Sequence, residues 1–348
     1  MQLAKLLFLY MCKFSGLFFL SSCICRKKLQ ILCYHGLSFD DEHNFQPKLS
    51  MQPHKFRKRM IFLKEKGFEV LALQEGLAIL TDGKIKKRSV VITFDDGFHN
   101  FFTLAKPILM EFGFPSTVYV TSYYVKHGNP VFRLAVRYMF WKSRKKKNEI
   151  FADIPCMTLF GFEKEDTEKE IMWKLIEYAE NYMDEENRRR LSEFLGKKMG
   201  ISFQDIDRRG LWHLMTPNEI EAIARSGVDV QLHTHRHRFP LDANIAKQEI
   251  EENRAVLEPI VGKKMRHFCY PSGVWNKTHW KALKEAGCYS ATTCESRMNS
   301  AKTPLLALGR FLDAEDIPQI EFEAEIYGFK DLLRYIFRFS KKGTRSVE

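Results

Sequence analysis

The sequence predicts an α/β fold, a distorted, closed or partly closed (β/α) barrel of about seven parallel strands with a helical insertion. Short apolar runs alternate with segments of helical periodicity, as expected when helices cover a parallel sheet. A chain of 348 residues accommodates one such barrel, which takes about 250 residues, together with an insertion. An apolar content of 45% supplies a large core and excludes a disordered chain.

The alternation begins with an apolar run at 29–34, which predicts a strand. A helix is predicted over 53–66, because Phe56, Met60 and Leu63 recur at helical spacing and share one face. The continuous apolar run that follows predicts a strand buried on both sheet faces. This strand spans 90–94, and after it come a helix over 101–112 that ends at Gly113 and a strand over 116–120.

The pattern resumes at Thr216 after a gap. Thr216 can cap a helix, Pro217 suits the first helical position, and Glu219 completes a capping box. These residues predict a helix over 217–225. The elements expected after it are strands over 228–232, 267–270, 290–293 and 305–311, and helices over 243–261 and 276–286.

The gap does not alternate. Its residues have amphipathic helical periodicity, and Thr167 can cap the start of one helix. We interpret the gap as a helical insertion that borders the mouth of the barrel. The predicted domains are a membrane-associating apolar and basic segment at 1–28, a barrel at 29–125 and 213–325, the insertion at 126–212, and a basic amphipathic tail at 326–348.

The N-terminal segment is rich in Leu and Phe, but Lys5 and Lys13 interrupt it. Its uninterrupted apolar stretch, 14–25, is shorter than the roughly 20 residues that span a bilayer. We therefore favour an interfacial helix on the cytoplasmic face of a bacterial membrane. A single-span anchor remains an alternative, and so does a lipoprotein, because residues 20–23 resemble a lipoprotein cleavage box.

The net charge of +12 is distributed in separate clumps, and neither an aromatic-interleaved basic stripe nor a nucleic-acid motif accompanies it. An acidic membrane surface or an anionic glycan is thus a better expected partner than nucleic acid. Eight cysteines form no paired CxxC spacing, which indicates a compartment that does not oxidise thiols. The basic clumps are 26–28, 55–66, 84–88, 144–147 and 341–342.

Two polar motifs follow predicted strands. Thr93-Phe94-Asp95-Asp96-Gly97 ends one apolar run, and His233-Thr234-His235-Arg236-His237 follows another. Functional groups of a parallel barrel gather at the C-terminal ends of its strands, so the two motifs are expected to meet. Asp-Asp-Gly alone is most often a solvated turn, and a histidine pair alone is a weak metal signal. The occurrence of both motifs after strands of one fold is the evidence for a metal site.

One carboxylate and two imidazoles suit a Zn²⁺, Co²⁺ or Ni²⁺ ion that keeps one position for water. The predicted ligands are Asp96, His233 and His237. A turn must bring the two histidines together, and His235 is expected to point elsewhere. A bound ion lowers the pKa of its water. Asp95 would stay ionised beside the cation and take the water proton.

With these residues the chain resembles the polysaccharide deacetylases, the NodB-homology or carbohydrate esterase 4 family, over roughly 30–125 and 214–311. The resemblance implies the same roles for the aspartates and histidines. The usual third motif is Arg-Pro-Pro-Tyr-Gly, and its counterpart here is Cys269-Tyr270-Pro271-Ser272-Gly273. The backbone N–H of Ser272 would then stabilise the oxyanion. The arginine that normally orients the base is absent, and Arg310 is the candidate substitute.

The later family motifs, which supply the usual general-acid histidine, do not occur after Thr293. The branch that acts on poly-N-acetylglucosamine has a Tyr-His at an N-terminal strand end, and Tyr34-His35 matches it. The chain is most similar to this branch, so His35 is the expected acid for the leaving amine. The competing interpretation of His35 is a core histidine bonded to a backbone carbonyl.

The predicted function is metal-dependent removal of N-acetyl groups from sugars of a glycan or glycolipid. The expected partners are an N-acetylated glycan or a lipid-linked sugar, and a membrane surface. Two alternatives stay open at this point. One is a hydrolase of a non-glycan amide, such as a cyclic ureide, and the other is a non-catalytic, membrane-associated glycan-binding protein.

Overall fold

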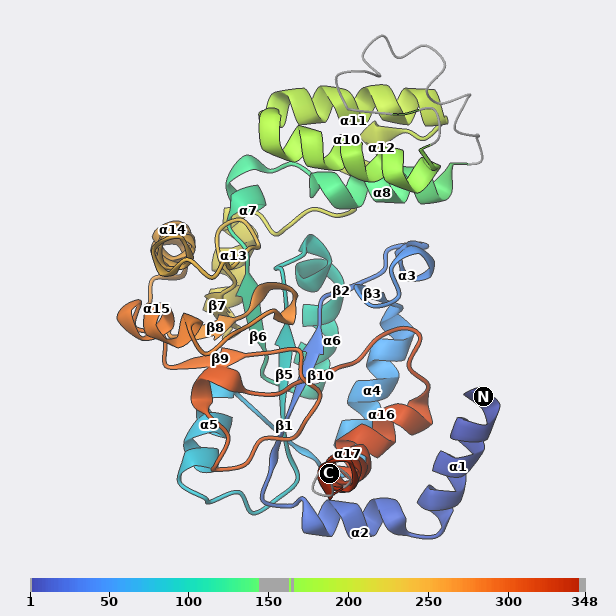
Figure 1. The fold of residues 1–348 in the computed structure, drawn as a ribbon, viewed down its shortest axis with the longest axis vertical. Coiled ribbons are helices and arrows are strands. Elements are labelled where there is room, and N and C mark those ends of the chain that lie inside the picture. Colours follow the sequence, from blue (N-terminus) through green and yellow to red (C-terminus); the bar gives the residue numbers. More distant parts are fainter. Residues whose placement is uncertain (1, 144–162, 164–165, 344–348) are drawn as a thin grey trace.

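A computed structural model describes residues 2–143, 163 and 166–343. Among them, eight strands form one parallel sheet in the order β10-β1-β5-β6-β7-β8-β9, with β4 also pairing with β5 (Figure 1). The strands are β1 Leu29–Tyr34, β4 Glu69–Leu71, β5 Ser89–Phe94, β6 Thr117–Val120, β7 Asp229–Leu232, β8 His267–Cys269, β9 Ser290–Thr292 and β10 Phe311–Leu312.

The two ends of the sheet meet through one segment, 308–312. Leu308 forms a parallel bridge with Thr292 of β9, and Phe311 pairs with Leu32 of β1. The predicted distorted (β/α) barrel is thereby confirmed. It is distorted because β10 is only two residues long, and because β4 and β6 pair with successive parts of β5.

The central strands β1 and β5 are buried along their whole length, as their continuous apolar runs predict. Side chains of β1 alternate between two cores. Leu32 and Tyr34 enter the larger core, and Leu29 and Ile31 enter a second one. Each such buried side chain stabilises the fold by about 1.5–3 kcal/mol. Burial of these side chains fixes the register of β1, and the register sets which residues of β1 face the site.

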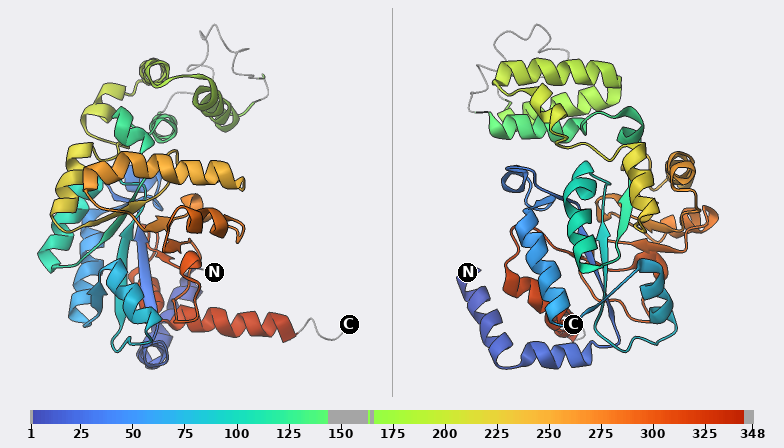
Figure 2. Two further views of the ribbon diagram at one scale, coloured as in Figure 1. Left: turned by 90° about the vertical axis from the view of Figure 1, so that its left-hand side faces the viewer. Right: turned by 180° about the vertical axis from the view of Figure 1, so that it is seen from behind.

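Helices cover the barrel (Figures 1 and 2). The predicted capping box of Thr216 is present. The helix predicted over 101–112 begins instead as a π-helical turn, because Pro107 cannot donate a hydrogen bond and crowds the preceding turn. The covering helices are α4 Pro53–Glu65, α5 Leu73–Thr81, η1 Phe101–Ala105, α6 Lys106–Phe112, α13 Pro217–Arg225, α14 Ala243–Val261 and α15 His279–Glu285.

Three expectations differ from the structure. The strand predicted over 305–311 begins only at Phe311, because Leu305–Ala307 after Pro304 forms a 3₁₀ turn. The helix predicted over 276–286 begins at His279. Strand β4 and helix α5 were not anticipated. Three small elements also precede α4, namely β2 Gly36–Leu37, α3 Glu42–Phe45 and β3 Ser50–Met51.

The described part of the insertion is helical and lies at one end of the barrel (Figure 1). Phe45 of α3 joins it to the barrel, with its ring centroid 5.6 Å from both Tyr138 and Trp212. Thr167 forms the predicted capping box. The basic clump 144–147 and Cys156 lie outside the described residues. The helices are α7 Tyr123–His127, α8 Phe132–Lys142, α10 Glu168–Tyr182, α11 Glu185–Met199 and α12 Phe203–Arg208.

Both terminal segments are helical and pack on each other. The helices are α1 Gln2–Phe14, α2 Leu17–Ile24, α16 Gln319–Ile326 and α17 Phe329–Gly343. In the part of the chain that the structure describes, no single helix is long and apolar enough to cross a membrane. The pair α1 and α2 passes this test by length and composition, but it is bent by 73°.

Candidate active site

Asp96, His233 and His237 converge beyond the C-terminal ends of β5 and β7. The Oδ1 atom of Asp96 lies 3.2 Å from Nε2 of His233 and 3.3 Å from Nε2 of His237. One ligand atom from each residue lies within 4.8 Å of the other two. The structure thus brings together the three residues that the sequence predicts as metal ligands.

Strained backbone positions these ligands. Asp96, His237 and Thr234 have φ values of 69°, 54° and 66°, in the left-handed region that non-glycine residues seldom adopt. Such conformations cost about 1–3 kcal/mol each and persist where the surroundings enforce them, often at functional sites. The strain supplies the turn that is needed to bring two histidines together after a strand.

Helix α14 holds the loop of residues 233–237 through hydrogen bonds from two buried side chains. The buried Asn253 accepts a hydrogen bond from the backbone N–H of His233 at 3.0 Å and donates to Val120 O and Ser122 Oγ. The buried Glu249 accepts from the N–H of Arg236 at 2.8 Å. The sequence analysis missed both residues. Polar side chains on the inner face of an otherwise apolar helix stripe were the available signal.

The ring of His233 is oriented by a backbone carbonyl. Its Nδ1 lies 2.9 Å from the carbonyl oxygen of Cys269. A carbonyl only accepts, so Nδ1 carries the proton, and in a neutral ring Nε2 remains free to bind a cation. Burial lowers the pKa of His237 to about 4, which keeps that imidazole neutral near pH 7. His235 points away and pairs with Ser122 at 2.9 Å.

Asp95 points to a different set of partners. Its two carboxylate oxygens pair with the Arg310 guanidinium at 2.6 and 2.7 Å. The thiols of Cys269 and Cys33 lie 3.4 and 3.5 Å from Oδ2. Burial opposes the charge of Asp95, but Arg310 outweighs it and holds the pKa of this carboxyl well below its usual range. Asp95 is therefore ionised and held in a fixed orientation.

Arg310 reaches Asp95 from the segment that closes the barrel. It is fully buried, and it also donates to Thr93 Oγ1 and Thr293 O. Its guanidinium lies 3.1 Å from the Cys269 thiol, at the position where the family motif has an arginine. A guanidinium from the segment just before β10 thus contacts Asp95 from beside this thiol, which agrees with Arg310 as the candidate substitute.

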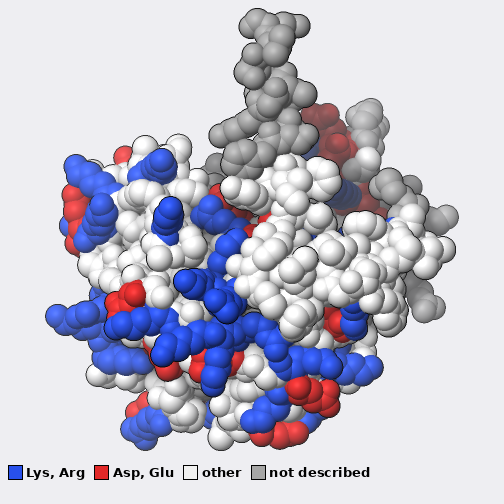
Figure 3. Space-filling model, turned by 90° about the horizontal axis from the view of Figure 1, so that it is seen from below, with Lys and Arg blue, Asp and Glu red and all other residues white. Residues whose placement is uncertain are grey.

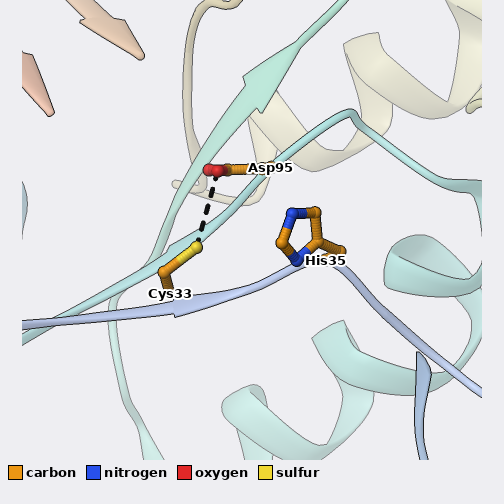
Figure 4. A group of neighbouring side chains, drawn as sticks. All are labelled: Cys33, His35 and Asp95. Carbon is orange, nitrogen blue, oxygen red and sulfur yellow. Dashed lines mark hydrogen bonds between the residues drawn. The ribbon is translucent and has the colours of Figure 1, made fainter. Parts of the chain in front are cut away.

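His35 lies beside Asp95 at the end of β1 (Figure 4). Ligand atoms of Cys33, His35 and Asp95 lie within 4.8 Å of one another, and the side chain of His35 is half-buried. In Figure 4 the imidazole of His35 points toward Cys33 and Asp95, which are joined to each other by a hydrogen bond.

Ser272 lies in the short turn Pro271–Gly273 that follows β8, and its side chain is exposed. Ser272 and Gly273 have φ values of 55° and 67°. The turn begins two residues after Cys269, whose carbonyl contacts His233. The strained turn therefore leaves the strand beside the metal-ligand cluster, where a backbone N–H could serve the reaction.

The residues of the cluster fit a divalent ion. Asp96 Oδ1 is buried and receives no hydrogen bond from any described residue, a costly state for a carboxylate oxygen unless a cation pairs with it. Two other clusters, Cys33-His35-Asp95 and Asp95-His233-Cys269, also have ligand spacing. Both depend on Asp95, whose oxygens Arg310 already occupies. The Asp96 cluster is therefore the favoured cation site.

Comparisons with known proteins relate part of the chain to one family of enzymes. Residues 179–291 match the family described as polysaccharide deacetylase. This match includes the histidine motif, while Asp95 and Asp96 lie outside it. A Bacillus subtilis relative named as a polysaccharide deacetylase, YxkH, is 31% identical over 101 residues, 29% of this chain and 34% of that protein. Poly-beta-1,6-N-acetyl-D-glucosamine N-deacetylase of Escherichia coli K12 is 31% identical over 78 residues, 22% of this chain and 12% of that protein.

Solved structures share the fold. Streptococcus pyogenes deacetylase PplD aligns with a TM-score of 0.56 at 16% identity, over 86% of this chain and 98% of that one. IcaB from Ammonifex degensii aligns with a TM-score of 0.52 at 17% identity, over 86% of this chain and 97% of that one. The fold is that of the deacetylase barrels. The predicted resemblance to the polysaccharide deacetylases is confirmed, although the chain matches only about a third or less of the length of these curated relatives.

Substitution of Arg310 should separate the orientation of the Asp95 carboxylate from the stability of the fold. In Arg310→Lys the charge remains, but a lysine cannot form the two parallel bonds to Asp95. If the chain carries out the deacetylation that the resemblance implies, the kcat for acetate release should fall about 10- to 100-fold with KM little changed, because misplaced reacting groups lower turnover. Steady-state kinetics on an N-acetylated glycan would measure this split.

Arg59→Lys is the matched control. Arg59 is also buried and paired with an aspartate, Asp313, at 2.9 and 3.2 Å. Asp313 accepts a hydrogen bond from Tyr34. Neighbouring residues of a strand point to opposite faces, so Tyr34 lies on the face of β1 opposite to Cys33, which contacts Asp95. This variant should lose comparable stability and keep its kcat. An equal loss of kcat in both variants would show that Arg310 acts only through the fold.

Proposed function

We propose that the protein is a metal-dependent hydrolase that removes N-acetyl groups from the sugars of a glycan, as a polysaccharide deacetylase. The observation that carries the proposal is the convergence of Asp96, His233 and His237 beside an ionised Asp95 that is not part of the cluster. This is a set of metal ligands with a separate base. The relatives, each matched over part of its length, support the same chemistry by their names.

The chain's own residues divide the reaction between them. A Zn²⁺, Co²⁺ or Ni²⁺ ion held by Asp96 and the two histidines would supply an acidified water and polarise the acetyl carbonyl. Asp95 accepts the proton of the attacking water, and Arg310 keeps its carboxylate aimed. The backbone N–H of Ser272 stabilises the charge that develops on the carbonyl oxygen. His35 protonates the departing amine.

The proposed substrate is an N-acetylated glycan. The E. coli relative is named for poly-beta-1,6-N-acetyl-D-glucosamine, and the Tyr34-His35 pair is shared with that branch by resemblance. A lipid-linked sugar has no such support. Every cysteine that the structure describes is a free thiol, which fits the proposed location at the cytoplasmic face of a membrane.

Metal removal is the direct test. Treatment with EDTA should reduce acetate release from an N-acetylated glycan to background, because the water then lacks its activating ion. Zn²⁺, Co²⁺ or Ni²⁺ added back should restore the activity, with acetate and free amine released in equal amounts. Acetate can be measured enzymatically and amine by a fluorogenic reagent.

The same assay decides between the alternatives. Metal-loaded protein that binds the glycan but releases no acetate would favour a non-catalytic glycan-binding protein. Hydrolysis of small cyclic ureides but not of glycans would favour the non-glycan amidase. Activity that survives complete metal removal would contradict the proposed mechanism.

A further inference from the structure

An apolar face covers the terminal helices on the side that points away from the barrel. Phe14 and Phe19 are 83% and 71% exposed, a strong departure from the usual burial of phenylalanine. Figure 3 shows this face as a broad white area. We call this face the terminal lobe. Its well-exposed apolar side chains include Leu3, Met11 and Phe14 of α1, Phe19 and Ile24 of α2, and Phe337 of α17.

The exposure is not a result of loose packing. The opposite sides of the same helices form a small core in which Leu9 and Phe18 pack with Ala324 and Phe329. Ser21 also donates a hydrogen bond to the carbonyl of Tyr327. Helices α1 and α2 are therefore fixed to α16 and α17 through one apolar side and present a second one to solvent. A patch of this kind marks a contact with a partner or a membrane.

The acidic residues of this region are neutralised within the molecule. Glu321 and Glu323 of α16 pair with Lys5 and Lys13 of α1, at 2.7 and 2.6 Å. Glu325 pairs with Arg334 at 2.7 Å. These carboxylates face inward and are largely buried. They add little negative potential to the surface beside the terminal lobe.

Exposed basic residues border the lobe. Arg26 and Lys27 follow α2 directly, and the 84–88 segment precedes β5 at the same end of the barrel. Arg88 lies over the ring of Tyr327 at 5.5 Å, and Tyr327 contacts Phe18 of α2, so the basic segment and the lobe are contiguous. Figure 3 shows a blue band of Lys and Arg beside the white face.

We propose that the terminal lobe docks the protein on the surface of an anionic lipid bilayer. The apolar side chains enter the boundary between headgroups and acyl chains, and Arg26, Lys27 and the 84–88 segment meet the lipid phosphates. An apolar helix face with a basic flank is the pattern of interfacial binding. The 73° bend means that α1 and α2 do not form one straight helical span. Helices of 13 and 8 residues are each too short to cross, since a span needs about 20.

The docking also orients the barrel. Helix α2 ends at Ile24, just before β1 begins at Leu29, so the lobe lies at the N-terminal ends of the strands. His35 and Asp95 follow the opposite, C-terminal ends of β1 and β5. The candidate site therefore opens away from the bilayer. This consequence rests on the proposed function, and it favours a glycan in the aqueous phase over a sugar attached to the same membrane.

Vesicle binding by the full chain tests the docking. We expect the protein to sediment with vesicles of phosphatidylcholine and phosphatidylglycerol, and much less with phosphatidylcholine alone. Phe14→Ser/Phe19→Ser should weaken binding at least about 10-fold through lost apolar burial. Arg26→Glu/Lys27→Glu should weaken it by about 10-fold or more, and high salt should reproduce that loss for the unmodified chain.

Matched controls lie on exposed positions elsewhere. Tyr182→Ser/Leu241→Ser removes two well-exposed apolar side chains, and Lys169→Glu/Lys197→Glu reverses two exposed charges on the insertion. Both should bind like the unmodified chain. Equal weakening by the controls, or no binding to anionic vesicles, would overturn the proposal. A stable dimer in solution that dissociates in the Phe14→Ser/Phe19→Ser variant would also overturn the proposal, because a second copy of the chain would then cover the lobe.

Acetate release separates this proposal from the proposed function. The lobe variants should retain full turnover on a soluble glycan, and sedimented, vesicle-bound protein should retain it as well. Binding without any acetate release would leave the docking intact and contradict only the hydrolase. Loss of turnover on binding to vesicles would contradict the orientation of the site.

Discussion

Asp95→Asn should reduce acetate release by about 100- to 10,000-fold, the usual contribution of a positioned general base, while the metal stays bound. The amide keeps the shape of the carboxylate but has no basic oxygen to accept the proton of the attacking water. Metal retention is expected because Asp95 pairs with Arg310 and is not part of the Asp96 cluster. Turnover and metal content measured on one preparation check both statements.

The fold has to be controlled in this experiment. The substitution leaves the buried Arg310 without its counter-charge, and breaking one side of a buried ion pair costs about 3–5 kcal/mol. The double variant Asp95→Asn/Arg310→Gln removes both charges and should regain much of the lost Tm. It should not regain turnover. If turnover returned together with stability, Asp95 would be a structural residue and not the base.

His237→Ala should lower zinc affinity by more than about 100-fold, since substituting even an outer-shell partner of a ligand costs 10–100-fold. His237 is the most accessible of the three ligands, so its removal should disturb the fold least. Acetate release should fall in parallel with the bound zinc. Elemental analysis after dialysis against a weak chelator would measure the loss.

His235→Asn provides the control within the same loop. The amide of asparagine can replace the ring nitrogen that pairs with Ser122 at 2.9 Å, so the loop conformation should persist and zinc should remain. Zinc loss in this variant as well would mean that loop disorder, not a missing ligand, explains the His237 result. An unchanged zinc content in His237→Ala would indicate that the ion binds at the Asp95-His233-Cys269 cluster instead.

Sequence reasoning located much of the barrel because its local signals agree with the fold. Apolar runs place β1 and β5, and the capping residues of Thr216 place α13. Prediction from the sequence was less accurate where the structure of a segment depends on the strand with which it pairs. Strand β4 is three residues long and holds its place through β5. The segment before β10 has apolar residues, but Pro304 and the joining of the two sheet edges make part of it a 3₁₀ turn.

The sequence alone predicted that Asp95, Asp96, His233 and His237 would lie together, because two short motifs sit at the ends of parallel strands and those ends must share one edge. Tertiary structure decided what supports them, although the sequence had already offered Arg310 as a candidate partner of Asp95. Arg310 meets Asp95 across 215 residues, and Asn253 reaches His233 from a covering helix. No local pattern encodes such contacts, because they exist only when barrel closure brings distant segments within hydrogen-bonding distance. The exposed side of the terminal helices is likewise defined only after their other side has packed.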